Sequence, residues 1–253
     1  MKEKQGLHEL STVNKVIAVV GGKGGVGKST VTSMLAVTMQ RKGLNTAIMD
    51  GDITGASIPH AFGLKENPDG TSEGIFPVFT KSGIQVMSMN LLLSSPTEPV
   101  VWRGAVLSEY LKSFWKKVIW TDVDCMFIDM PPGTADIPIT VLSLPIDGAV
   151  VVVTPQELAS GIAEKAIVMA KQLGVPILGI IENQSYFDCP TCGKRHYIYG
   201  KGTLENLADK YEIGLRAKIP INKDIRVQTD KGLIELFEGD FIDSFSDGLE
   251  ELW

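Results

Sequence analysis

The sequence predicts an α/β protein with three layers, in which a mostly parallel, doubly wound sheet lies between two layers of helices. Two observations predict this fold: short apolar or β-branched runs alternate with helix-compatible stretches, and most of the runs show little polar alternation. Such runs are typical of parallel strands that are covered on both faces. The chain has no internal repeat and no linker rich in proline, glycine or serine, so we expect one domain over residues 1–253.

The expected elements alternate along the whole chain. Strands are expected at 15–20, 45–50, 84–89, 125–130, 148–153, 176–183 and 215–220. Helices are expected at 28–42, 104–118, 157–173, 201–211 and 241–251. The first helix carries Val31, Met34 and Leu35 at helical spacing, and Gly43 follows it as a C-terminal cap.

Composition and charge exclude several classes of protein. Hydrophobic residues make up 44% of the 253 and charged residues 21%, which is ordinary for a soluble globular protein. No apolar run approaches the roughly 20 residues that span a bilayer, and the N-terminus lacks the apolar core of a secretory signal. The net charge of −6 argues against a broad nucleic-acid footprint. Three cysteines make no disulfide framework and fit a reducing cytoplasm, where Cys-x-x-Cys more often indicates metal or redox chemistry.

A phosphate-binding loop follows the first expected strand. The stretch GGKGGVGKST, residues 21–30, satisfies G-x-x-x-x-G-K-[ST] between a strand and a helix, which predicts a P-loop NTPase fold. Its N–H groups would face phosphate oxygens, and the helix dipole would add to them. Lys28 would reach the β- and γ-phosphates, Ser29 would ligate Mg²⁺, and Thr30 would face the α-phosphate. The expected nucleotide-binding residues of the loop are Gly22, Gly24, Gly25, Val26, Gly27, Lys28, Ser29 and Thr30. The alternative is a glycine-rich turn that binds nothing.

Carboxylates follow two further strands. Asp50 and Asp52 lie at the carboxyl end of the second strand, where ligands of such sheets bind. We expect Asp52 to position the attacking water, and Asp50 to assist it or to contact Mg²⁺ through water. Asp129 ends an apolar strand, as a Walker B aspartate does, and would hold Mg²⁺ indirectly. In PPGTAD, the Gly133 N–H would sense the γ-phosphate and Asp136 would relay its presence. The alternative for the first pair is two turn-forming aspartates.

The stretch SYFDCPTCGKRH contains half of a metal site. Cys189 and Cys192 have Cys-x-x-Cys spacing, whereas a closed Zn²⁺ site or a 4Fe–4S cluster takes four ligands. His196 completing a Cys₂His zinc set is one alternative. A thioredoxin-type redox pair is another, but it needs the start of a helix, and Pro190 and Gly193 favour a knuckle turn. The third cysteine, Cys125, is expected in the core.

The loop resembles the deviant Walker A of the MinD, ParA and nitrogenase iron protein class. In that class the early lysine, here Lys23, reaches the nucleotide of the facing subunit, so the resemblance implies a homodimer with two facing ATP sites. It also implies that Asn183 reads the adenine edge. Gln156 and the segment from Ile219 resemble further walls of the nucleotide pocket.

The full order of motifs is similar to the Mrp/ApbC family of iron–sulfur cluster carrier ATPases, from about residue 14 to 238. The resemblance implies that Cys189 and Cys192 of each subunit meet across the dimer axis and hold one 4Fe–4S cluster. It also implies apo iron–sulfur proteins as recipients and an assembly scaffold as donor. Departures from the family pattern affect loop shape and not the catalytic carboxylates; they are Gly51, Ala56, Ala105 and Gln184.

Two rival functions have weaker support. A MinD-like membrane ATPase would use a basic amphipathic C-terminal helix, whereas residues 234–253 are acidic and contain no lysine or arginine. A ParA-like DNA ATPase would need a basic patch. Apolar residues of the tail have i, i+4 spacing, which predicts docking on the body or on a partner; they are Phe237, Phe241, Phe245, Leu249 and Trp253. We therefore expect a cytoplasmic homodimeric ATPase that carries a labile cluster, with Mg²⁺, Lys28, the partner's Lys23 and Asp52 assisting hydrolysis. The alternative is a MinD/ParA-like regulatory ATPase with a structural zinc clasp.

Overall fold

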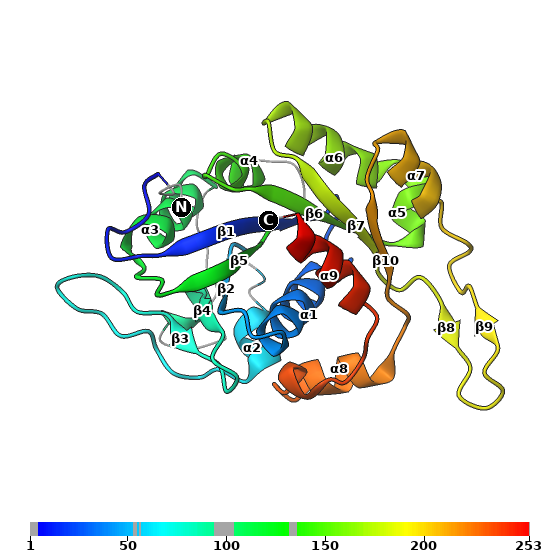
Figure 1. The fold of residues 1–253 in the computed structure, drawn as a ribbon, viewed down its shortest axis with the longest axis horizontal. Helices are drawn as coiled ribbons and strands as arrows, with labels where there is room; N and C mark the ends of the chain where they lie inside the picture. Colours follow the sequence, from blue (N-terminus) through cyan, green and yellow to red (C-terminus); the bar gives the residue numbers. More distant parts are fainter. Residues whose placement is uncertain (1–4, 53–54, 56, 94–103, 132–135, 253) are drawn as a thin grey trace.

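The molecule is built around an eight-stranded sheet (Figure 1). A computed structural model describes residues 5–52, 55, 57–93, 104–131 and 136–252. The strand order is β10-β7-β6-β1-β5-β2-β4-β3, and all neighbouring pairs are parallel except β3 with β4. Helices cover both faces of this sheet. The predicted three-layer, doubly wound and mostly parallel fold is therefore confirmed.

Each apolar run predicted to be a strand contains one. The strands of the large sheet are β1 Val13–Val20, β2 Thr46–Asp50, β3 Val78–Phe79, β4 Gln85–Met87, β5 Val123–Asp129, β6 Gly148–Val153, β7 Ile177–Glu182 and β10 Leu215–Lys218. A separate hairpin pairs β8 Phe187–Asp188 with β9 Arg195–His196. The predicted strand at 84–89 is shorter, because a 3₁₀ turn begins at Met89.

The helices include three that the apolar periodicity does not predict. In chain order the helices are α1 Lys28–Arg41, α2 Ile58–Phe62, α3 Gly104–Lys117, α4 Asp136–Leu142, α5 Pro155–Ser160, α6 Ile162–Gln172, α7 Leu204–Lys210, α8 Lys223–Asp230 and α9 Asp243–Glu251, with 3₁₀ turns at Met89–Leu91 and Ile234–Leu236. The predicted helix 157–173 is divided into α5 and α6 at Gly161, whose φ is 70°. The short helices α2, α4 and α8 have too few turns to show a period. None of the helices in the described ranges has the length and apolar content that a bilayer crossing requires.

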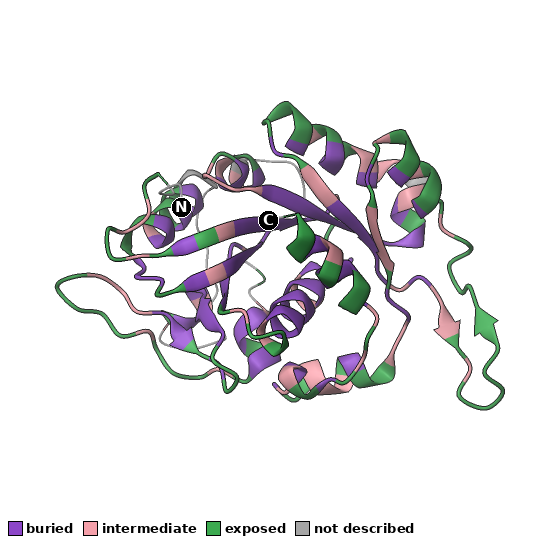
Figure 2. Ribbon diagram, in the orientation of Figure 1, coloured by how far each residue is buried: buried purple, intermediate pink, exposed green. Residues whose placement is uncertain are grey.

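Two apolar clusters fill the space between the sheet and its helices. Figure 2 shows that most of the sheet centre is buried. Successive residues of β1 point to opposite faces, so Val16 and Ala18 join one cluster while Ile17 and Val19 join the other. The first cluster packs under α3, α4, α6 and α7, and the second under α1, α2, α8 and α9. Burial of both faces explains why the central strands read as continuous apolar runs. Cys125 is buried in the second cluster, as predicted.

The acidic C-terminal helix docks on the body of the protein. Phe245 and Leu249 of α9 are buried against β7 and β10. A Cβ atom on Gly179 of β7 would lie 2.4 Å from the Phe245 ring, so this strand position accepts only glycine without displacing the helix. Lys42, which caps the C-terminus of α1, also pairs with Asp247 of α9. The tail therefore takes the first of the two predicted roles; Trp253 lies outside the described residues.

Candidate functional site

The predicted phosphate loop and carboxylates meet at the carboxyl edge of the sheet. The loop joins the central strand β1 to α1, and β5 and β6 flank β1. Asp50 and Asp129 end β2 and β5 and are register partners of each other. This edge is where ligands of doubly wound sheets bind.

The structure explains why two positions of the loop are occupied by glycine. Gly27 has a φ of 86° and precedes α1, and a Cβ atom on it would lie 2.2 Å from Asn183 Nδ2. A Cβ atom on Gly22 would lie 2.6 Å from the carbonyl oxygen and side chain of Ile162. The left-handed conformation and these close approaches exclude other residues at both positions.

Lys28 is buried inside the loop and faces acidic side chains. It is 6% exposed, and its Nζ donates a hydrogen bond to the Lys23 carbonyl at 3.2 Å. Burial lowers the pKa of Lys28, while the charges of Asp129, Asp52 and Glu157 act in the opposite direction. The arrangement places one ammonium group beside three carboxylates at the mouth of the loop.

Ser29 and Asp129, which lie 100 residues apart in the sequence, are in direct contact. Ser29 Oγ donates to Asp129 Oδ2 at 2.5 Å, and Thr32 Oγ1 donates to Asp129 Oδ1 at 3.0 Å. Asp129 is fully buried, and this burial raises its pKa to about 6 in spite of both hydrogen bonds. Thr32 was not predicted as a site residue, although it lies one turn after Ser29 on the same helix.

Asp50 and Asp52 form a second acidic group beside Asp129. Ser88 Oγ donates to Asp50 Oδ2 at 2.9 Å, and the Asp52 N–H donates to Asp50 Oδ1 at 3.1 Å. Burial, followed by the charge of Asp129, raises the pKa of Asp50 well above its ordinary value. The oxygen donors of Ser29, Asp129 and Asp50 are of the kind that Mg²⁺ prefers, so these residues fit a magnesium ion. Ser88 was not identified from the sequence, because it carries no motif.

Asn183 is bound to the phosphate loop. Its Nδ2 donates to the Val26 carbonyl at 2.8 Å, and its Oδ1 accepts from the Gln184 N–H at 3.0 Å. Asn183 also lines a cavity of about 370 Å³ with Gly27, Thr30 and the segment after Ile219. The cavity walls include Pro220, Ile221 and Ile225. The structure thus places Asn183 beside the phosphate loop and shows a clamp on the loop that was not predicted, while the reading of the adenine edge stays a prediction.

A second cavity, of about 210 Å³, lies against residues 23–26 of the loop. Lys23, Gln156, Glu157 and Ile162 are among its lining residues. Glu157 is buried, and its burial raises its pKa. The predicted lysine and Gln156 therefore share one hollow, and Glu157 is a charged residue there that sequence reasoning missed. Of the predicted switch, Gly133 lies outside the described residues and Asp136 begins α4.

The cysteine pair lies on a hairpin that extends from the body (Figure 1). The Cys189 N–H donates to the Lys194 carbonyl at 3.0 Å, and the Gly193 N–H donates to the Cys189 carbonyl at 2.8 Å. Gly193 has a φ of 68°, so the pair occupies the predicted knuckle turn and not the start of a helix. Backbone N–H groups of Cys192 and Thr191 lower the pKa of the Cys189 thiol, which favours the thiolate that binds metals.

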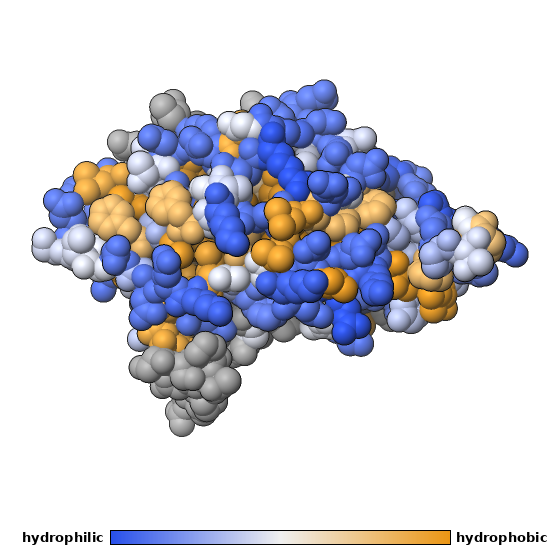
Figure 3. Space-filling view, turned by 90° about the horizontal axis from the view of Figure 1, so that it is seen from below, coloured by the Kyte–Doolittle hydropathy of each residue, from blue (hydrophilic) through white to orange (hydrophobic). Residues whose placement is uncertain are grey.

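Side chains hold the hairpin in one shape but supply no further metal ligand. Arg195 donates two hydrogen bonds to Asp188, at 2.8 and 2.9 Å, and its guanidinium lies 3.6 Å from the centre of the Tyr186 ring. No group of three histidine, cysteine, aspartate or glutamate side chains that could hold a metal occurs in the described part of the chain. The Cys₂His alternative with His196 therefore finds no support. Figure 3 shows hydrophobic surface beside hydrophilic surface at the right end of the molecule. Large side chains that follow β9 and are exposed include Tyr197, Ile198 and Tyr199.

Comparison with known proteins identifies the family. Residues 12–243 match the ParA family described as NUBPL iron-transfer P-loop NTPase. The chain belongs to this family. An iron–sulfur cluster carrier protein from Methanocaldococcus jannaschii is 41% identical over 227 residues, which cover 88% of this chain and 78% of that protein. A cytosolic Fe–S cluster assembly factor from Yarrowia lipolytica is 39% identical over 241 residues, 91% of this chain and 83% of the factor. The resemblance predicted from the motifs is thus confirmed.

A comparison with solved structures agrees with the fold. A nucleotide-binding protein from Archaeoglobus fulgidus, in complex with ADP, has a TM-score of 0.83 and 43% sequence identity, and the match covers 92% of each chain. Family membership and this match support a P-loop NTPase.

Proposed function

We propose that this chain is an ATPase that binds a 4Fe–4S cluster between two subunits and transfers it to apoproteins, with residues 1–253 as one domain and α9 as its acidic C-terminal helix. One observation carries the proposal: the same chain has a phosphate loop with Lys28, Ser29 and Asp129 gathered at the sheet edge, and an exposed hairpin that offers two cysteine ligands. The names of relatives at about 40% identity support the iron–sulfur half of the proposal.

The loop and the carboxylates would bind and hydrolyse ATP. N–H groups from Gly22 to Thr30 would surround the phosphates, and Lys28 would stabilise charge on the β- and γ-oxygens. Asp52, whose backbone N–H donates to Asp50 Oδ1, would orient the attacking water. Ser29 and Asp129 would hold Mg²⁺, Ser29 directly and Asp129 from behind it; when bound, this ion neutralises phosphate charge. Lys23 would act on the nucleotide of a second subunit.

The cluster is the cargo of this ATPase. A 4Fe–4S cluster takes four thiolates, and one chain offers two on its hairpin, so Cys189 and Cys192 of two subunits would complete the set. Because Cys192 is exposed, thiolates of an acceptor protein have access to the cluster and would replace Cys189 and Cys192 on the iron. The partners would be a second copy, apo iron–sulfur proteins as recipients and an assembly scaffold as donor.

The surroundings of the protein follow from charge and from its relatives. A net charge of −6 and the acidic helix α9 oppose binding to nucleic acid or to anionic lipid. We place the protein in the cytoplasm, because a relative at 39% identity is named a cytosolic assembly factor.

Metal analysis after anaerobic reconstitution tests the proposal. About four iron and four acid-labile sulfide per dimer are expected in the wild type, and none in Cys189→Ala/Cys192→Ala. The iron of the wild type should also move to an added apoprotein. Lys28→Ala should abolish ATP hydrolysis and leave iron binding intact. Tightly held zinc without exchange would overturn the carrier and favour a regulatory ATPase with a zinc clasp. Hydrolysis that persists in Lys28→Ala would overturn the assignment of the loop.

A further inference from the structure

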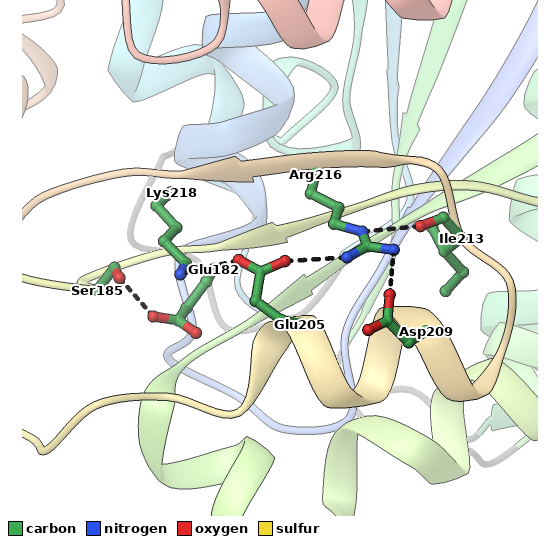
Figure 4. Close-up of polar contacts among 7 residues, drawn as sticks. All are labelled: Glu182, Ser185, Glu205, Asp209, Ile213, Arg216 and Lys218. Carbon is green, nitrogen blue, oxygen red and sulfur yellow. Dashed lines mark hydrogen bonds and ion pairs between the residues drawn. The ribbon is translucent and has the colours of Figure 1, made fainter.

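Glu182, the last residue of β7, has a buried carboxylate that is satisfied at one oxygen only (Figure 4). The residue is 1% exposed. Its Oε1 accepts a hydrogen bond from Ser185 Oγ. Its Oε2 is buried and has no hydrogen-bond partner among the described residues. Because a buried acceptor oxygen without a donor is costly, a donor that approaches it would be bound well.

A donor lies beside it on the segment that returns from the cysteine hairpin. Gly202 precedes α7, and a Cβ atom built on it would lie 2.1 Å from Glu182 Oε2. Within the described residues, the N–H of Gly202 makes no hydrogen bond. An acceptor that lacks a donor therefore lies against Gly202, whose N–H has no protein acceptor among the described residues.

The residues after Glu182 are attached to the nucleotide loop. Asn183 Nδ2 donates to the Val26 carbonyl at 2.8 Å, and the Asn183 N–H donates to the Val153 carbonyl at 2.8 Å. The Ser185 N–H donates to the Ile219 carbonyl at 2.9 Å. Asn183 thus connects the phosphate loop to the segment that carries Ser185, whose hydroxyl contacts the Glu182 carboxylate.

The same segment continues into the metal hairpin. Tyr186 follows Ser185, and its ring stacks on Arg195, which holds Asp188 next to Cys189. Contacts between named residues therefore run without interruption from Val26 in the phosphate loop to Cys189. Gly202 lies on the segment after the hairpin and Ser185 on the segment before it, so both segments lie against Glu182.

We propose that Glu182, Ser185 and Gly202 form a latch through which nucleotide in the phosphate loop changes the metal affinity of the cysteine pair. The structure shows the open latch; in the closed latch, Gly202 N–H donates to Glu182 Oε2. Phosphate binding fixes the Val26 peptide and thereby Asn183 and Ser185, which favours the closed latch and orders both ends of the hairpin. When the hairpin is already ordered, metal binding costs it less conformational entropy, so the coupling is positive. Glu182 is a positioning residue in this scheme, which rests on the proposed nucleotide and metal sites.

Cobalt titration of the anaerobic full-length protein, with and without Mg²⁺ and the non-hydrolysable analogue AMPPNP, measures the coupling. In the wild type, AMPPNP should tighten Co²⁺ binding by at least about fivefold, the low end of measured allosteric couplings, and Co²⁺ should tighten AMPPNP binding by the same factor. In Glu182→Met and in Ser185→Ala this factor should fall toward one, while each ligand alone still binds. Ser185→Ala removes a single hydroxyl and serves as the test even where Glu182→Met does not fold.

Glu205→Gln is the matched control. Glu205 of α7, labelled in Figure 4, pairs with Lys218 at 3.1 Å and Arg216 at 3.0 Å, outside the latch. The Glu205→Gln variant should keep the coupling factor of the wild type. Hydrogen exchange gives a second readout: AMPPNP should slow exchange of the Gly202 amide in the wild type and not in Glu182→Met.

Each contrary outcome has a separate meaning. Wild-type protein that binds both ligands with a coupling factor of one would overturn the latch and leave the proposed function intact. A factor in both latch variants equal to that of the wild type would also overturn it. Wild-type protein that binds no Co²⁺ at Cys189 and Cys192, or no AMPPNP, would overturn the proposed function itself.

Discussion

The clamp between Asn183 and the phosphate loop leads to a prediction about nucleotide affinity. In Asn183→Asp, an oxygen replaces the Nδ2 group that donates to the Val26 carbonyl at 2.8 Å. The hydrogen bond from the Gln184 N–H to Oδ1, at 3.0 Å, survives the change. The substitution therefore removes one contact at a site that is 8% exposed, and places a carboxylate oxygen against a carbonyl oxygen.

The size of the effect follows from the lost donor. Leaving a buried carbonyl oxygen without a donor costs about 1–3 kcal/mol. If this cost falls on the nucleotide-binding conformation of the loop, nucleotide affinity falls about 5- to 150-fold. Because the clamp holds the loop and not the base, the loss should be the same for ADP, GDP and tripolyphosphate.

Calorimetric titration with these three ligands is the assay. Asn222→Asp is the matched control, because Asn222 lines the same cavity and, within the described residues, its side chain bonds through Oδ1 alone, which accepts from the Asp224 and Ile225 N–H groups. An aspartate keeps that role, so affinity should not fall. A loss in Asn183→Asp that is confined to ADP would refute the clamp and show that Asn183 acts by reading the base.

Three further predictions concern stability and metal binding. The stability of the wild type relative to Asp129→Asn should fall as pH rises from about 4 to about 6. Burial raises the pKa of Asp129 to about 6, so the folded chain keeps this proton to a higher pH than the unfolded chain does. Phe245→Ala should lower the free energy of unfolding by about 3–5 kcal/mol, because the buried ring packs on Gly179. Cys125→Ala should leave iron per dimer unchanged, because this cysteine is buried in the core away from the hairpin.

Urea unfolding and metal analysis check these predictions. A constant stability difference between wild type and Asp129→Asn across this pH range would show that the folded pKa is not raised. For Phe245→Ala the control is Phe79→Ala, at a side chain that is 57% exposed, where a change within about 0.5 kcal/mol is expected; equal losses in both would contradict the docking of α9. Iron lost in Cys125→Ala with folding retained would place Cys125 among the ligands.

Much of the fold was predictable because its signals are local. The strands of the sheet centre have both faces buried, so apolar runs such as 148–153 need no partner to be recognised. The phosphate loop and the knuckle turn depend on glycines whose conformations are set within a few residues, as at Gly27 and Gly193. The division of 157–173 at Gly161 was not predicted, since the apolar periodicity continues across the break.

The sequence by itself determined the sheet, the nucleotide loop, the Cys-x-x-Cys turn and the family, because each is written in residues that lie close together along the chain. Only the tertiary structure decided that Thr32 and Ser88 hydrogen-bond the buried carboxylates, that Asn183 clamps Val26, and that Gly202 lies against Glu182. These contacts join positions that the register of parallel strands and the return of long connections bring together. No short-range preference of the chain encodes that register, so the coupling between its two candidate sites became visible only in three dimensions.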